Sequence, residues 1–220
     1  MSGISVLLPV AVTSDTAGLR RAHKSIVEQT ASPSEVVFVT NQSLTEDIEM
    51  AIEDLVSTHS DSRHEHIPDA SGLGDVLQAG LKRCSEPFVA RMDADDISEP
   101  ERFADQQTVL TDTKADVVGS HLAEFHGDPE HPERTREVPI THDEISEWMS
   151  WRCPLNHPTT MFDREAVLSA GGYRDFPMME DWDLWARCLS AGLRFRNLDK
   201  TLVRAQIDDL IDRRGGLDYA

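Results

Sequence analysis

The strongest chemical signal in the sequence is a cluster of carboxylates in the segment Arg91–Asp96, which reads RMDADD. Asp93, Asp95 and Asp96 follow the apolar run Pro87–Ala90, which is typical of a buried strand. Carboxylates this close together repel one another, so a bound cation would stabilise them. Because the segment contains no thiolate or imidazole, the expected cation is a hard one, Mn²⁺ or Mg²⁺, which prefers oxygen ligands and can bridge carboxylates to a diphosphate.

Clustered carboxylates also occur in EF-hands, phosphatases and nucleotidyltransferases, which differ in spacing and in their place along the chain. An EF-hand loop that began at Asp93 would need glycine and glutamate where the chain has Ser98 and Ala104, so the segment is not an EF-hand. A phosphatase with a D-x-D nucleophile usually carries it after the first strand, whereas here it follows the fourth predicted strand. A nucleotidyltransferase also uses metal-bound carboxylates, and the residues alone leave that alternative open.

A second group of acids begins a segment with helical periodicity that ends near Gly192. On a helical wheel Glu180 falls on the polar side with Asp183 and Arg187, whereas Asp181 falls in the apolar arc, which contains Trp182, Trp185, Ala186, Cys188 and Leu189. Apolar surroundings raise the proton affinity of a carboxylate, so Asp181 is a candidate general base and Glu180 is the fallback. The alternative is that these acids only stabilise the N-terminus of the helix through its macrodipole.

Three weaker signals accompany the acids. His157 lies in the irregular stretch NHPT, where it could contact a phosphate or hydroxyl group or serve as a hydrogen-bonded structural histidine. Gly72 and Gly74 lie at the start of a predicted helix and could let the backbone approach a ligand, although most such pairs only form turns. His64 and His66 are assigned to a solvated strand face, because no third metal ligand is in sight.

The elements that must position these residues alternate between strand and helix. The pattern predicts strands at Ile4–Leu8, Glu35–Val39, His64–Ile67 and Pro87–Met92, connected by helices at Thr16–Gln29, Leu44–Thr58 and Leu73–Cys84. Such alternation favours an α/β fold with a mostly parallel central sheet flanked by helices. Ligands of these sheets bind at the carboxyl ends of the strands, where the RMDADD segment lies.

The second part of the chain is less regular. We expect Ser98 and Glu101 to form a capping box that opens a helix through Leu110. The remaining predictions are a strand at Asp116–Phe125, a loop over residues 127–139, an irregular stretch over 148–158, a strand at Thr160–Phe162, and helices at Arg164–Ala170 and Glu180–Ala191.

Composition excludes several classes of protein. The chain has 220 residues, 39% of them hydrophobic, and 40 acids against 21 bases give a net charge of −19. That charge argues against nucleic acid as a partner and against simple adsorption to anionic lipid, and it predicts a halophilic protein adapted to high salt. The absence of an apolar run of about 18 residues and of a basic leader predicts a cytoplasmic protein. The spacing of Cys84, Cys153 and Cys188 indicates neither a disulfide framework nor a zinc site.

Taken together, these segments resemble the family 2 glycosyltransferases of the GT-A fold, most closely the exopolysaccharide branch that includes amylovoran-type enzymes. The likeness runs from Ile4 to Arg204, and its strongest blocks are RMDADDISEPERF, NHPT, GGY and EDWDLW. It implies a single GT-A domain over residues 1–205, with a nucleotide-sugar-binding half at 1–115 and an acceptor and catalytic half at 116–205. Residues 206–220 would then be a C-terminal tail of a truncated or minimal member.

The resemblance implies a role for each candidate residue. Asp95 would be the metal ligand on the donor's diphosphate, with Asp93 near the ribose or the metal and Asp96 supporting them. Asp181 would deprotonate the acceptor hydroxyl in an inverting hexosyl transfer, with Glu180 as the fallback base. Residues implied to bind the nucleotide-diphosphate sugar donor are Pro9, Asn41, Gly72, Arg91, Asp93, Asp95, His157 and Arg204. The implied acceptor is a glycan or a polyprenyl- or dolichyl-linked glycan, reached at the cytosolic membrane face through a partner protein.

The sequence departs from the family pattern at three positions. Asn41 stands where an acidic residue usually meets the nucleobase, so the preferred nucleotide is open. Ala70 replaces an expected asparagine, and Gln206 replaces a histidine that would assist the metal or the phosphates. These departures leave room for a second hypothesis, in which the chain is a sugar-nucleotide-binding module with impaired catalysis.

Overall fold

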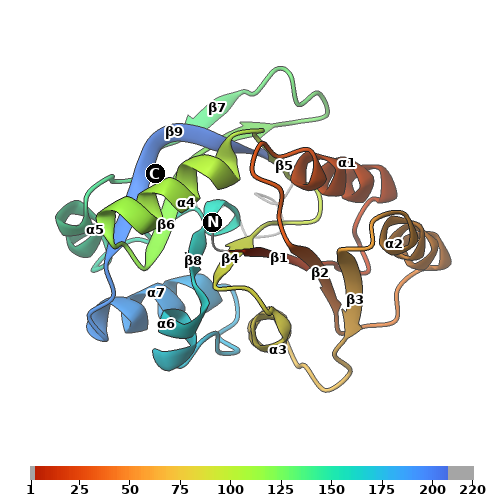
Figure 1. The fold of residues 1–220 in the computed structure, drawn as a ribbon, viewed down its shortest axis with the longest axis horizontal. Coiled ribbons are helices and arrows are strands. Elements are labelled where there is room, and N and C mark those ends of the chain that lie inside the picture. Colours follow the sequence, from red (N-terminus) through yellow and green to blue (C-terminus); the bar gives the residue numbers. More distant parts are fainter. Residues whose placement is uncertain (1–2, 208–220) are drawn as a thin grey trace.

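The computed structural model describes residues 3–207 and shows strands and helices alternating through the first half of the chain (Figure 1). The strands of this half are β1 (Ile4–Pro9), β2 (Glu35–Thr40), β3 (Ser62–His66) and β4 (Phe88–Arg91). The helices between them are α1 (Thr16–Val27), α2 (Glu46–Thr58) and α3 (Leu73–Arg83). Every strand and helix predicted for this half is therefore present, with ends that differ by a few residues.

The second half adds shorter strands and helices. Its strands are β5 (Ile97–Ser98), β6 (Val117–Phe125), β7 (Arg134–Arg136), β8 (Met161–Asp163) and β9 (Phe195–Gln206). Its helices are α4 (Arg102–Thr113), α5 (His142–Trp148), the 3₁₀ turn η1 (His157–Thr159), α6 (Arg164–Ser169) and α7 (Glu180–Ser190).

All described strands join one curled sheet in the order β3-β2-β1-β4-β8-β6-β9-β5, with β7 paired to β6. Strands β3, β2, β1 and β4 run parallel, whereas β8 is antiparallel to both β4 and β6. Strand β9 then runs parallel to β6 and pairs antiparallel with β5. The predicted mostly parallel α/β sheet is confirmed, and the antiparallel β8 joins its two halves.

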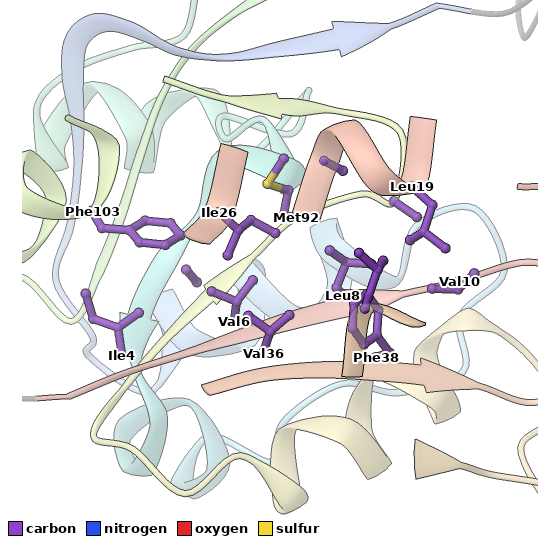
Figure 2. Packing of buried hydrophobic residues seen from close by; sticks show 14 of the residues in the cluster. Ile4, Val6, Leu8, Val10, Leu19, Ile26, Val36, Phe38, Met92 and Phe103 are labelled. Atoms are coloured by element: carbon purple, nitrogen blue, oxygen red, sulfur yellow. The ribbon is translucent and has the colours of Figure 1, made fainter. Parts of the chain in front are cut away.

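Helices cover both faces of the sheet because the buried strands carry apolar side chains on both sides. Along β1, Val6 and Leu8 point into one cluster with α1, α2 and α4, and Leu7 points into a second cluster with α3, α5, α6 and α7. Figure 2 shows the first cluster, where Ile26 of α1 and Phe103 of α4 close over the strands. Burying a side chain of this size contributes about 1.5–3 kcal/mol, so the two clusters fix the sheet between its helices.

Two predictions for the second half are wrong. The capping box does not form, because Ser98 belongs to β5 and pairs with Val203 of β9, so that α4 begins only at Arg102. The loop predicted over residues 127–139 contains β7, whose Arg134 and Arg136 both bind the buried Glu124. Helix α5 and strand β9 are additional elements. Of the predicted tail at 206–220, Gln206 ends β9 and residues 208–220 lie outside the described part.

Candidate active site

The carboxyl ends of three parallel strands meet at one edge of the sheet and place Pro9, Asn41 and Arg91 of the predicted donor residues there. Pro9 at the end of β1 is in register with Val39 of β2, one residue before Thr40 and two before Asn41. On the other side of β1, Leu7 is in register with Arg91, the last residue of β4. The carbonyl of Leu7 accepts the N–H of Met92 at 3.2 Å. The acidic segment therefore begins where a ligand of this sheet is expected.

Arg91 is the most connected residue at this edge. Its side chain is buried and its guanidinium holds both oxygens of Asp93, at 2.7 Å to Oδ2 and 2.6 Å to Oδ1. Burial works against the charge on Arg91, but the Asp93 carboxylate outweighs it and raises the pKa of the guanidinium. Asp93 is thus fixed by a two-point ion pair, with its side chain 39% exposed toward solvent.

Asp96 lies on the inner side of the same segment and is buried. Its Oδ1 accepts the backbone N–H of Gln206 at 3.3 Å, and its Oδ2 has no hydrogen-bond partner. Burial, then the negative charges of Asp93 and Asp95, raise the pKa of Asp96 well above its usual range. A cation that joined this segment would relieve the mutual repulsion of the acids and the cost of the unpaired oxygen.

A buried arginine fastens the strand end behind these acids. Arg102, at the start of α4, donates to the carbonyl of Arg91 at 2.7 Å and to that of Thr160 at 3.3 Å. Burial lowers the pKa of Arg102 to about 9. Arg102 is not among the predicted site residues, although its place shortly after the acidic segment was readable in the sequence.

The segment before Asp96 is also held from α1. Arg21 donates to the carbonyl oxygen of Asp95 at 3.5 Å and to Oε1 of Gln206 at 2.6 Å. Gln206, which replaces the expected histidine, therefore accepts a hydrogen bond from Arg21 with its side chain and donates one to Asp96 with its backbone N–H.

Asp181 lies in the first turn of α7, whose Leu184, Trp185 and Cys188 are buried. Its Oδ1 accepts the N–H of Trp182 at 2.8 Å, and its Oδ2 accepts the thiol of Cys153 at 3.6 Å. Burial raises the pKa of Asp181, while the positive charge of Arg91 acts in the opposite direction. The carboxylate predicted for the apolar arc is therefore half-buried, within electrostatic reach of the arginine that holds Asp93.

Asp183 occupies different surroundings from Asp181, whereas the charge of Glu180, like that of Asp181, acts on Tyr173. Asp183 forms an ion pair with Arg187 at 2.8 Å, and Arg187 also donates to the carbonyls of Ala170 and Gly172. This ion pair ties α7 to the Gly171-Gly172 turn. The polar side of the predicted helix is thus used for attachment.

His157 is buried at the start of η1, where its Nε2 lies 2.9 Å from the hydroxyl of Tyr173. Burial, then the positive charge of Arg91, lower the pKa of His157 well below its usual range, so the imidazole is neutral. Of the two predicted contacts of His157, a phosphate or a hydroxyl group, this structure shows a hydroxyl, that of Tyr173. Tyr173 is the tyrosine of the GGY block.

The remaining predicted donor residues have partners of their own. Asn41 donates to the carbonyl of Ala70 at 3.2 Å. A Cβ at Gly72 would overlap the Asp175 carboxylate, so this glycine allows the stretch before α7 to approach α3. Arg204 on β9 forms ion pairs with Glu99 at 2.8 Å and Glu130 at 2.6 Å, which fasten it between the acidic segment and the β6–β7 hairpin.

The donor set at this edge is suited to a hard metal ion but is incomplete by itself. Within residues 3–207, no group of three His, Cys, Asp or Glu side chains converges closely enough to hold a metal ion. Asp93 is engaged by Arg91, whereas the buried Oδ2 of Asp96 has no partner. Ligands from outside the protein, such as diphosphate oxygens, would have to complete the coordination shell.

This fold is similar to that of solved glycosyltransferases of the GT-A class. Mannosyltransferase PcManGT from Pyrobaculum calidifontis, in complex with GDP-Man and Mn²⁺, superposes with a TM-score of 0.70 at 16% identity, over 93% of this chain and 56% of that one. S. aureus TarS 1-349, in complex with UDP-GlcNAc, gives 0.73 at 18% identity, over 94% of this chain and 59% of that one. The chain therefore spans less than two thirds of either structure, and the predicted GT-A fold is confirmed.

The sequence comparisons define the family. Residues 5–171 match the family described as Glycosyl transferase family 2, and the chain belongs to this family. It is 33% identical over 218 residues to an uncharacterized glycosyltransferase of Haemophilus influenzae, covering 98% of this chain and 80% of that protein. It is 37% identical over 149 residues to the amylovoran biosynthesis glycosyltransferase AmsE of Erwinia amylovora, covering 67% and 56%. The chain is a glycosyltransferase, as the sequence blocks predicted.

The name of a third relative states the reaction of that protein. The UDP-Gal:alpha-D-GlcNAc-diphosphoundecaprenol beta-1,3-galactosyltransferase of Escherichia coli is 29% identical to the chain over 223 residues, covering 98% of this chain and 78% of that protein. In the part of this chain that the structure describes, no helix is long and apolar enough to cross a membrane.

Proposed function

We propose that this chain is an inverting, metal-dependent hexosyltransferase that moves a sugar from a nucleotide-diphosphate donor to a glycan or a polyprenyl- or dolichyl-linked acceptor. The observation that carries the proposal is the pairing of two carboxylates around Arg91. Asp93 is bound to this arginine, and Asp181, in the first turn of α7, lies within reach of its charge. In this assignment residues 1–115 bind the donor and residues 116–205 supply the base and the acceptor surface.

Asp95 and Asp96 would hold Mn²⁺ or Mg²⁺, with Asp93 beside them. The metal would act as a Lewis acid that neutralises charge on the departing diphosphate. Arg91 orients Asp93 by its two-point ion pair, and Arg102 fixes the backbone at the end of β4. Support for the metal comes from the unpaired Oδ2 of Asp96 and from the Mn²⁺ and GDP-Man in the PcManGT complex.

Asp181 would take the proton from the acceptor hydroxyl as that oxygen attacks the anomeric carbon. Its raised pKa keeps its proton affinity higher than that of an exposed aspartate, which suits a general base. Attack from the side opposite the leaving diphosphate inverts the configuration of the sugar. Neutral His157 and Tyr173 lie near Arg91 and would position donor oxygens by hydrogen bonds rather than by charge.

The names of two relatives support a lipid-linked glycan as the acceptor. The Escherichia coli relative is named for transfer to a diphosphoundecaprenol-linked sugar, and AmsE for amylovoran biosynthesis. A lipid-linked acceptor would bring this acidic chain to the cytosolic membrane face, where a partner protein would hold it against the repulsion of anionic lipid.

Titration calorimetry with UDP-, GDP-, dTDP- and CMP-sugars, in Mn²⁺ and then in EDTA, tests the donor site. We expect one nucleotide class to bind, with binding lost in EDTA and in Asp95→Asn. Binding that is equally strong in EDTA would contradict the metal assignment, and an absence of binding to the whole panel would favour the impaired module.

Asp181→Asn tests the base with the donor that binds. Donor affinity should be retained while turnover falls by about 10²–10⁴-fold, the usual contribution of general base catalysis. Asp183→Asn, which removes a carboxylate two residues away on the side paired to Arg187, is the matched control. Equal turnover in wild type and Asp181→Asn would show that Asp181 is not the base.

A further inference from the structure

Cys153 is the residue that approaches Asp181 most directly from another part of the chain. It lies between α5 and η1, and it is the one cysteine of three that is not fully buried, since Cys84 and Cys188 are both inside the core. Its Sγ is 3.6 Å from Oδ2 of Asp181 and 3.4 Å from the carbonyl oxygen of Leu155. The contact joins segments that are 28 residues apart.

The segment that carries Cys153 is itself fixed to α7. The indole N–H of Trp182 donates to the carbonyl of Met149 at 3.0 Å, and Leu155 is buried in the same core as Trp185. These contacts lie on both sides of Cys153 along the chain, so its thiol has a defined position relative to the first turn of α7.

The two oxygens of Asp181 therefore have donors of unequal strength. Oδ1 is held by the backbone N–H of Trp182 at 2.8 Å, a normal hydrogen bond, whereas a thiol is a weak donor at a longer distance. Of the two oxygens, Oδ2 thus keeps more of its basicity while its direction is still defined. The weak donor orients the carboxylate without using up the lone pair that must take a proton.

We propose that Cys153 is a positioning residue for sugar transfer, which orients Oδ2 of Asp181 toward the acceptor hydroxyl through a weak S–H hydrogen bond. This inference rests on the proposed role of Asp181 as the base. Other charged or titratable groups that act on the pair are Arg91 of β4, Tyr173 and Arg136 of β7, whereas the charge of Glu180 acts on Tyr173. None of them replaces the thiol as a hydrogen-bond donor to Oδ2 among the contacts of residues 3–207.

The first test needs no turnover and asks whether the contact exists. Burial, then the negative charge of Asp181, raise the pKa of the Cys153 thiol, and only the thiolate reacts with iodoacetamide. Asp181→Asn should therefore speed alkylation of Cys153 at pH 8, by about threefold for each half unit of pKa released. The rate is read by mass spectrometry of the Cys153 peptide. Asp183→Asn is the control, and equal rates in all three proteins would overturn the proposal.

The second test asks whether the contact serves the reaction. The acidic limb of the kcat/KM profile reports the pKa of the free enzyme's base. Cys153→Ala removes a donor to the carboxylate, so the limb should move to higher pH, whereas Cys153→Ser supplies a stronger donor and should move it to lower pH. Cys84→Ala removes a thiol whose charged neighbours are Glu35, Arg63 and Arg164 rather than Asp181, so it should leave the limb in place.

The two tests separate this inference from the function on which it rests. The positioning role would be overturned if the acidic limb stayed in place in the Cys153 variants, or if it moved in the same direction in both. In that case, loss of turnover in Asp181→Asn would still support Asp181 as the base. Full turnover in Asp181→Asn would instead remove the base, and the alkylation rates would then report a structural contact alone.

Discussion

Replacing Gly74 with alanine should lower the free energy of unfolding, although alanine is the better helix former. Gly74 is the second residue of α3 and faces the backbone of Arg174 and Asp175. A Cβ at Gly74 would lie 2.6 Å from the carbonyl carbon of Arg174 and 2.9 Å from the Cα of Asp175. The carbonyl oxygen of Arg174 would be closer still. Because ordinary contacts begin near 3.4 Å and the carbonyl oxygen of Arg174 is the nearest atom, the backbone before α7 would have to move by more than 1 Å.

Two opposing magnitudes decide the outcome. Alanine gains at most about 1 kcal/mol over glycine in a helix, and less in the first turn. Overpacking against a fixed neighbour costs about 1–3 kcal/mol, and here the neighbour is backbone, which cannot rotate away as a side chain can. We therefore expect a net loss of about 1–2 kcal/mol. Because the displaced segment leads directly to Asp181, turnover should fall as well, by about 10²-fold for a 1 Å misplacement.

Urea unfolding followed by circular dichroism, together with donor turnover, measures both effects. Gly18→Ala is the matched control, since Gly18 also lies in the first turn of a helix but its added Cβ would meet Asp15 and Asp95 no closer than 3.4 Å. Its unfolding midpoint should stay level or rise. A midpoint for Gly74→Ala equal to or above that of wild type would refute the packing argument.

Two further predictions concern pH and salt. Burial raises the pKa of Asp181, and only the ionised carboxylate can act as the base. The value of kcat/KM should therefore fall as the pH drops, with an acidic limb above the usual aspartate pKa of 3.8. A limb at or below 3.8 would contradict the burial of Asp181. The net charge of −19 predicts that the urea midpoint rises in molar KCl because salt screens the repulsion among the acids. An unchanged midpoint would remove the expectation of a halophilic protein.

The first half of the fold was predictable because its local signals agree. In β1 and β2 the apolar runs are long enough for buried strands, and the helices between them have clear apolar faces. The placement of the acidic segment at a strand end followed from that alternation. Asp181 on the apolar side of α7 followed in the same way from helical periodicity.

The second half was less predictable because its elements depend on distant partners. Strand β9 reads FRNLDKTLVRAQ, without regular alternation, and its pairing with β6 shifts register around His121. Strands β5 and β7 are too short to show a pattern. Helix α5, by contrast, carried a readable signal, since Thr141 and Glu144 form the capping box that was wrongly expected at Ser98.

The candidate site shows the same division. Arg91 and Asp93 lie two residues apart at a strand end, where side chains face the same way, so their ion pair could have been inferred from spacing alone. The contact of Cys153 with Asp181 could not, because it joins segments that only the completed sheet brings together. Asn41, Gly72 and Arg204 stay predicted donor residues, and their partners in this structure are now known.

The position of β8 in the sheet affects the order in which the chain can fold. Strands β3, β2, β1 and β4 come from one continuous stretch, Ile4–Arg91, and can pair soon after it is synthesised. Strand β8 must return about 70 residues later to pair with β4, and contacts across such long loops form slowly. Since Asp181 lies beyond β8, the two carboxylates around Arg91 meet only at a late stage of folding. In the proposed assignment, a partly folded chain would therefore carry the acidic segment of β4 before the base on α7 lies beside it.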